Sequence, residues 1–117
     1  MNWYKTAQKL RGYKIVGYDG NRYYSLYDQS PINTQIGSIA SMGGHGLYLG
    51  TSVEFCKDYY SGLTDDNEAL LTYEFLPQDI IKGNSTSEGE IQVRSATLVA
   101  VQNLPQSVSP DLGKPSQ

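Results

Sequence analysis

Residues 13–27, with the sequence YKIVGYDGNRYYSLY, carry the strongest fold signal in this chain. Two runs rich in tyrosine and aliphatic side chains flank Asp19-Gly20-Asn21, and an Asp-Gly step between such runs is typical of a hairpin turn. The segment therefore predicts two antiparallel strands, at residues 13–18 and 22–27.

On the N-terminal side of this hairpin, the spacing of apolar residues favours a helix. Within residues 2–11, Trp3, Ala7 and Leu10 fall on one helical stripe, and Gly12 follows as a stop signal. We expect a short amphipathic helix there.

On the C-terminal side, residues 28–46 are rich in glycine and polar side chains, which predicts a long loop. Residues 46–50, GLYLG, predict a short strand. Thr51 and Glu54 then have the spacing of a capping box, in which a hydroxyl and a carboxylate each satisfy a free backbone N–H of the first helical turn. The pattern predicts a helix over residues 52–60.

The remaining elements predict further strands. Residues 69–75 read as one strand, and residues 90–101 either bend near Ser95 or form two strands. Strands and helices mix without regular βαβ alternation, which favours the α+β class: a largely antiparallel twisted sheet, a short N-terminal helix and one central helix. Residues 1–104 form a single compact domain in this interpretation, and residues 105–117 form a flexible polar C-terminal arm.

The composition excludes several function classes. A chain of 117 residues with 38% hydrophobic and 18% charged side chains is long enough for one globular domain. Its net charge of −3 argues against duplex nucleic acid as a partner. One cysteine and one histidine argue against a disulfide and against a metal site. No apolar run is long enough for a membrane span or a signal peptide, so we expect a soluble, cytoplasmic protein without membrane contact.

Conventional nucleophile and phosphate motifs are weak in this chain. Cys56 and His45 are formally a nucleophile–base pair, but Cys56 falls among apolar residues of the predicted helix, where a buried inert thiol is expected. The glycines of residues 43–46 match neither the dinucleotide fingerprint nor the Walker pattern.

The order of elements after residue 46 nevertheless resembles the core of the ADP-ribosyltransferase fold. The strand of residues 46–50 leads into a helix that ends in Tyr59-Tyr60, and a later strand opens with Glu90. In the diphtheria-toxin-like and poly-ADP-ribose-polymerase branch of that family, such a strand and helix supply two tyrosines that enclose nicotinamide, and the glutamate polarises a ribose hydroxyl.

The resemblance implies specific roles for these residues. Tyr48 and Glu90 would form the catalytic pair. Tyr59 would stack on the nicotinamide ring, with Tyr60 beside it in the ligand site. Cleavage of the nicotinamide bond passes through an oxocarbenium-like state, which a nearby carboxylate stabilises.

The arginine-toxin branch of the same family offers a second partial match. Its Ser-Thr-Ser triplet resembles Gly50-Thr51-Ser52, which would add Ser52 to the ligand-binding set, and its Glu-x-Glu pair resembles Glu88-Gly89-Glu90. The first strand lacks the family's His or Arg, so Arg22 or Arg94 would lie near the phosphates. The implied protein is a small module that binds NAD or an ADP-ribose-type nucleotide, and the resemblance leaves catalysis open.

A second interpretation is a non-enzymatic interaction protein. The same layout resembles small uncharacterised domains of phage and bacterial genomes, and ten tyrosines offer good contact residues for a protein partner or for a second copy of the chain. The C-terminal arm would order on binding. In this interpretation Tyr48, Tyr59 and Tyr60 pack on the sheet, and Glu90 is a surface charge.

Overall fold

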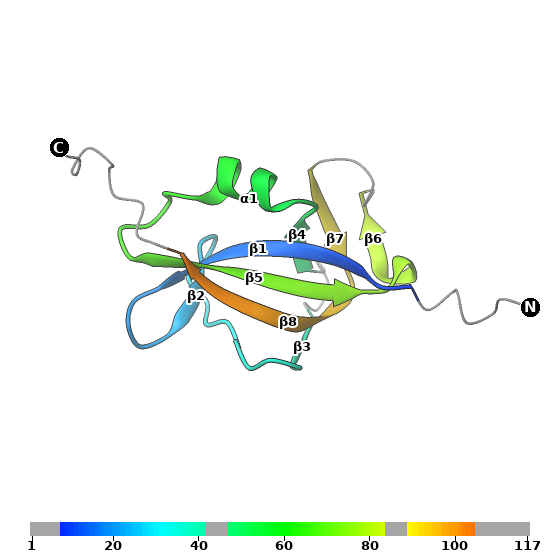
Figure 1. Cartoon of the computed structure of the whole chain (residues 1–117), viewed down its shortest axis with the longest axis horizontal. Helices are drawn as coiled ribbons and strands as arrows, with labels where there is room; N and C mark the ends of the chain where they lie inside the picture. Colours follow the sequence, from blue (N-terminus) through cyan, green and yellow to red (C-terminus); the bar gives the residue numbers. More distant parts are fainter. Residues whose placement is uncertain (1–7, 42–46, 84–88, 105–117) are drawn as a thin grey trace, which may run out of the picture.

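One antiparallel sheet dominates the computed structural model, which describes residues 8–41, 47–83 and 89–104 (Figure 1). The strand order is β3-β8-β5-β1-β4-β7-β6, and β2 also pairs with β1. In chain order the elements are β1 (Leu10–Tyr18), β2 (Tyr23–Ser25), β3 (Ile39–Ser41), β4 (Leu47–Gly50), α1 (Val53–Tyr60), β5 (Asn67–Phe75), the 3₁₀ turn η2 (Pro77–Asp79), β6 (Ile80–Lys82), β7 (Glu90–Val93) and β8 (Ser95–Leu104).

The hairpin prediction is confirmed. β1 and β2 pair antiparallel, with Tyr18 opposite Tyr23. The carboxylate of Asp19 accepts hydrogen bonds from the backbone N–H groups of Asn21 and Arg22, both at 2.9 Å. Gly20 has a φ of 97°, which a residue without a Cβ adopts easily. The carboxylate of Asp19 and the positive φ of Gly20 therefore close the turn, as expected for an Asp-Gly step.

The predicted N-terminal helix is wrong where the structure describes it. Leu10 and Arg11 open β1 instead and pair with Phe75 and Glu74 of β5, while Trp3 and Ala7 lie outside the described residues. A full ladder of hydrogen bonds to a nine-residue partner outweighs a weak local helix preference. The domain is consequently sheet-rich rather than an α+β domain with two helices: strands hold 53% of the described residues and helical segments 13%.

The long-loop prediction for residues 28–46 also needs correction. Residues Ile39–Ser41 form β3, which pairs with the start of β8. Three residues are too few to show a strand period, so only the long-range partner reveals this strand. Residues 42–46, including His45, lie outside the described part of the chain. In residues 90–101 the two-strand alternative is confirmed, because β7 and β8 are separated at Arg94.

Two apolar clusters lie on opposite faces of the sheet. Alternate residues of β1 and β5 point to each face, as Val16 and Ala69 belong to the larger cluster and Ile15 and Leu70 to the smaller. The larger cluster also contains further buried residues of β5 and buried residues of β4, β7 and β8: Leu71, Tyr73, Phe75, Leu47, Leu49, Ile91, Val93, Ala96 and Leu98. Helix α1 covers the smaller cluster with Cys56, and this second face carries the candidate site.

Candidate functional site

Helix α1 begins one residue later than the capping-box pattern indicates. Ser52 is the N-cap, and its Oγ accepts a hydrogen bond from the backbone N–H of Phe55 at 3.0 Å. The hydroxyl of Ser52, which the resemblance assigned to ligand binding, is therefore used to start the helix.

Thr51 is not the N-cap of α1. It connects the end of β4 to the residue before β7. Its backbone N–H donates to the carbonyl of Gly89 at 2.8 Å, and its Oγ1 accepts from the N–H of Gly89 at 2.9 Å. These two bonds fix the residue directly before Glu90. Sequence reasoning missed this role, because Thr51 and Gly89 are far apart in the chain.

A row of three residues across the sheet forms the base of the site. Tyr13 of β1 lies opposite Gly50 of β4, and Gly50 lies opposite Glu90 of β7. A Cβ on Gly50 would lie 2.4 Å from the Sγ of Cys56, so only glycine lets α1 approach this closely. The thiol of Cys56 in turn donates to the carbonyl of Tyr13 at 3.4 Å. Helix α1 thus packs against both β4 and β1.

The end of α1 brings a tyrosine to the predicted glutamate. The hydroxyl of Tyr60 donates a short hydrogen bond to Oε2 of Glu90. Burial, and then the hydrogen bond to Glu90 and its negative charge, raise the pKa of Tyr60. The ring of Phe55 meets the Tyr60 ring edge-on at 6.1 Å. A half-buried phenol and an exposed carboxylate therefore form one hydrogen-bonded pair.

Tyr48 lies on the same face of the sheet as this pair. Tyr48 is opposite Gln92 in the β4–β7 ladder, two residues from the Gly50–Glu90 pair. Because side chains alternate with a period of two, Tyr48 and Glu90 point to the same face. Diagonal neighbours of this kind have Cβ atoms roughly 7 Å apart. With 44% of its surface exposed, Tyr48 is accessible to a ligand.

The other residues of the predicted site lie elsewhere. Tyr59 is 66% exposed and its ring contacts Phe55 at 4.6 Å, so Tyr60 is the helix tyrosine that meets Glu90. Arg94 follows the far end of β7, and its backbone N–H donates to the carbonyl of Asp79 at 2.7 Å. Arg22 belongs to the β1–β2 turn. That turn begins five residues along β1 from the row at Tyr13, a distance of about 17 Å at roughly 3.3 Å per residue.

Lys14 is an additional cationic group that sequence reasoning did not select. It is half-buried opposite Leu71, on the face of the larger cluster, and burial lowers its pKa while the charge of Glu90 acts in the opposite direction. A lone lysine inside an apolar strand was the available signal. Strand alternation directs Lys14 and Glu90 to opposite faces of the sheet, and the charge of Glu90 still acts on the ammonium of Lys14, so we place Lys14 beside the site.

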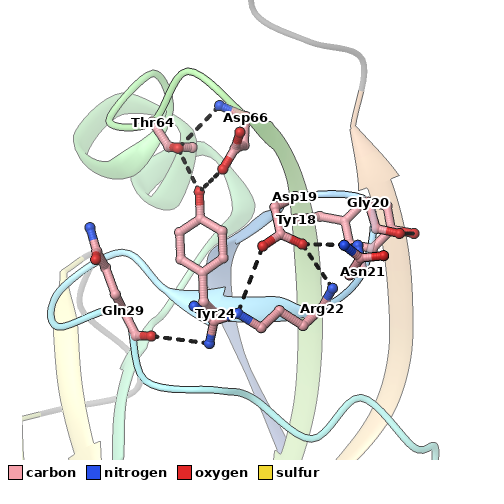
Figure 2. Close-up of polar contacts among 9 residues, drawn as sticks. All are labelled: Tyr18, Asp19, Gly20, Asn21, Arg22, Tyr24, Gln29, Thr64 and Asp66. Atoms are coloured by element: carbon pink, nitrogen blue, oxygen red, sulfur yellow. Dashed lines mark hydrogen bonds and ion pairs between the residues drawn. The ribbon is translucent and has the colours of Figure 1, made fainter.

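Arg22 instead takes part in a second polar cluster, shown in Figure 2 around the phenol of Tyr24. The hydroxyl of Tyr24 donates to Oδ2 of Asp66 and accepts from the hydroxyl of Thr64, both at 2.6 Å. The guanidinium of Arg22 lies 5.7 Å from the centre of the Tyr24 ring and 3.7 Å from Oδ2 of Asp19. These residues line an open polar pocket of about 360 Å³.

Comparison with known proteins places this chain in no family: no family model, no curated protein and no solved structure matches it. Within the described ranges, no group of three or more histidine, cysteine or acidic side chains is arranged to hold a metal ion. The part of the chain that the structure describes also contains no helix long and apolar enough to cross a membrane. The resemblance to ADP-ribosyltransferases therefore stays a prediction.

Proposed function

We propose that the face of the sheet beside α1 binds NAD or a related ADP-ribose-type nucleotide. The observation that supports this most directly is the hydrogen bond between Tyr60 and Glu90, with Tyr48 on the same face. Three side chains from β4, α1 and β7 are thus found at one face of the sheet, in the order of elements on which the resemblance rests.

The chemistry of these side chains suits a nucleoside ligand. The carboxylate of Glu90 can accept hydrogen bonds from ribose hydroxyls. The rings of Tyr48 and Tyr60 offer aromatic faces to a planar base or a nicotinamide ring. A carboxylate beside the ribose also stabilises positive charge that develops when the nicotinamide bond breaks. Binding is the proposed function, and bond cleavage is the reaction that this arrangement would support.

The Tyr60 hydroxyl bonds to one of the two carboxylate oxygens of Glu90, and a carboxylate has a second oxygen that can accept from a ribose hydroxyl. Ligand binding in this proposal therefore does not require loss of the Tyr60 hydrogen bond. Tyr60→Phe removes the phenol hydroxyl and keeps the carboxylate, whereas Glu90→Gln removes the negative charge, so the two variants separate the two roles.

Thermal shift and calorimetric titration with NAD and with ADP-ribose test the proposal. A ligand that binds only the folded protein raises its melting temperature. We expect a shift for the unmodified chain, a loss of roughly tenfold or more in affinity for Glu90→Gln, and little change for Glu54→Gln, an equivalent substitution in the exposed first turn of α1. No shift at millimolar NAD or ADP-ribose would contradict the proposal. Release of nicotinamide by the unmodified chain but not by Glu90→Gln would extend it to catalysis.

Exposed tyrosines favour a second candidate, a non-enzymatic interaction protein. Tyr27 is 94% exposed and Tyr59 is 66% exposed, and tyrosine is a frequent anchor in protein interfaces. If a partner covers them, Tyr27→Ser and Tyr59→Ser should weaken its binding without altering the response to NAD. This candidate gains support if the unmodified chain fails to respond to either nucleotide.

A further inference from the structure

The two outer edges of the sheet differ in their protection against further strand pairing. On one side β6 is the edge strand, three residues long, and it carries Lys82. On the other side β3 covers only the beginning of β8. Natural sheets commonly protect their edges with short strands and charged side chains, above all lysine.

The second half of β8 has an open edge among the described residues. β3 pairs with β8 at Ser95 to Thr97, and further backbone bonds join Leu98 to Gly37 and Ser38. From Ala100 to Leu104, β8 pairs with β5 in regular register on one side, and no described strand lies on its other side. Each residue of a strand has one backbone N–H and one C=O, so this edge presents a row of groups able to pair with another strand.

This edge is also the uncharged part of an acidic molecule. No Asp, Glu, Lys or Arg occurs in residues 95–104 or in residues 29–53, which include β3, although the chain carries a net charge of −3. Two exposed apolar side chains belong to the segment that covers the start of β8: Ile39 in β3 is 72% exposed, and Ile36 just before β3 is 57% exposed. Two like-charged copies repel each other least where neutral surfaces meet.

We infer that the open edge of β8 pairs with β8 of a second copy of this chain, forming a two-fold dimer with a continuous sheet. A two-fold axis perpendicular to the sheet makes the two β8 strands antiparallel. The regular segment has Gln102 at its centre. Gln102 then faces Gln102 of the second copy, and Ala100 faces Leu104 of the second copy.

This pairing explains the neutrality of β8. In an isologous antiparallel pair, a charged residue at the centre would face its own copy, and like charges directly opposite destabilise a strand pair. A site for a charged peptide would instead carry the opposite charge along the edge. The inference is independent of nucleotide binding, because β8 is separated from β4 and β7 by β5 and β1.

Two variants of opposite charge test the dimer. Ala100 and Gln102 are both exposed, so charges there leave the core intact. We expect the full chain to dimerise in size-exclusion chromatography with light scattering. Ala100→Lys with Gln102→Lys, and separately Ala100→Glu with Gln102→Glu, should each raise the dimer dissociation constant roughly tenfold or more. An equimolar mixture of the two double variants should restore the dimer, and this rescue excludes misfolding as the cause of the loss.

A matched control places two lysines on distant exposed positions. Gln78→Lys with Ile81→Lys adds the same charge in η2 and in β6, the strand at the opposite edge of the sheet, and should leave the dimer unchanged. A chain that is monomeric at every concentration overturns the inference, as does a dimer that both double variants retain. Slower amide hydrogen exchange in residues 100–104 at dimer-forming concentrations would support it.

Discussion

Tyr24 and Tyr60 form the same kind of pair in two different settings. Each donates its hydroxyl to a carboxylate, of Asp66 and Glu90 respectively. Tyr24 is only 7% exposed, and its hydroxyl has a second partner in Thr64. Tyr60 is half-buried, and its carboxylate partner is exposed. The Tyr24 pair thus joins the hairpin to the loop before β5, whereas the Tyr60 pair leaves the carboxylate of Glu90 accessible to solvent.

The largest expected difference between the pairs is in stability. Tyr24→Ala should lower the free energy of unfolding by about 3–5 kcal/mol, because it empties a buried site of aromatic size. Tyr60→Ala should cost clearly less, because its ring keeps contact with solvent. Urea unfolding curves of the two variants measure this directly. An equal loss of unfolding free energy in both variants would show that the two tyrosines contribute equally to stability.

A glycine lies close to each tyrosine–carboxylate pair, and replacing that glycine with alanine tests how much the pair depends on the close approach. A Cβ on Gly17 would lie 2.3 Å from Cζ of Tyr24, and a Cβ on Gly50 would lie 2.4 Å from Sγ of Cys56. Gly17→Ala and Gly50→Ala should each cost about 1–3 kcal/mol through overpacking. Only Gly50→Ala should also weaken nucleotide binding, because it displaces α1 and with it Tyr60. The same loss of binding in Gly17→Ala would contradict this assignment.

Alkaline pH affects the two tyrosine pairs for different reasons. The pKa of Tyr60 is raised above its ordinary value of 10.0, first by burial, and the pKa of Tyr24 is raised first by its hydrogen bond to Asp66. A group whose pKa is higher in the folded state contributes stability below its unfolded pKa and loses it as the pH rises further. Stability should therefore fall above pH 10. Burial also raises the pKa of Tyr73 to about 12, so part of the fall persists in every Tyr24 or Tyr60 variant.

The two causes can be separated by neutralising each carboxylate. Asp66→Asn should remove most of the Tyr24 contribution to the alkaline fall. Glu90→Gln should leave the part of the Tyr60 contribution that comes from burial. Free energies of unfolding measured on both sides of pH 10 give the slope of stability against pH for each variant. Identical slopes in the two variants would argue against a hydrogen-bond cause at Tyr24 and a burial cause at Tyr60.

The smallest expected effect concerns the thiol beneath α1. Burial raises the pKa of Cys56 from 9.0 to about 11, which lowers its thiolate fraction at neutral pH about 100-fold. Cys56 should therefore react slowly with an alkylating reagent in the folded chain and rapidly in urea. Gly50→Ala should speed the reaction by loosening α1, and Tyr24→Phe should not. A fast reaction in the unmodified folded chain would show that α1 opens readily.

Local signals in the sequence predicted the local elements. The Asp-Gly turn, the β4 strand, helix α1 and β5 all have patterns that a short window contains. β3 and the first residues of β1 have none, because their partners in β8 and β5 lie far along the chain. Pairing with a distant strand decided these segments, and no window of the sequence displays such a partner.

Prediction of the candidate site was limited in the same way, because it depends on contacts between segments far apart in the chain. Glu90 and Tyr48 lie on one face because β4 and β7 are neighbours in the sheet, whereas the resemblance implied only that the two residues share a site. The choice between Tyr59 and Tyr60 depends on how α1 is rotated about its axis, which the contact of Cys56 with Gly50 determines. Arg22 is near the hairpin turn in sequence, but β1 extends away from the site, so proximity along the chain was misleading.

The position of β1 at the centre of the sheet governs when this chain can fold. Its longest partner, β5, ends at Phe75, so the ladder cannot close until that residue has been made. Ribosomes add about 5–20 residues per second. For several seconds during synthesis β1 has beside it only the short strand β2 and then a single residue pair with β4, and an isolated hairpin is marginally stable. A nascent chain halted before Phe75 should therefore remain sensitive to protease, and one extended past Leu104 outside the ribosome should become resistant.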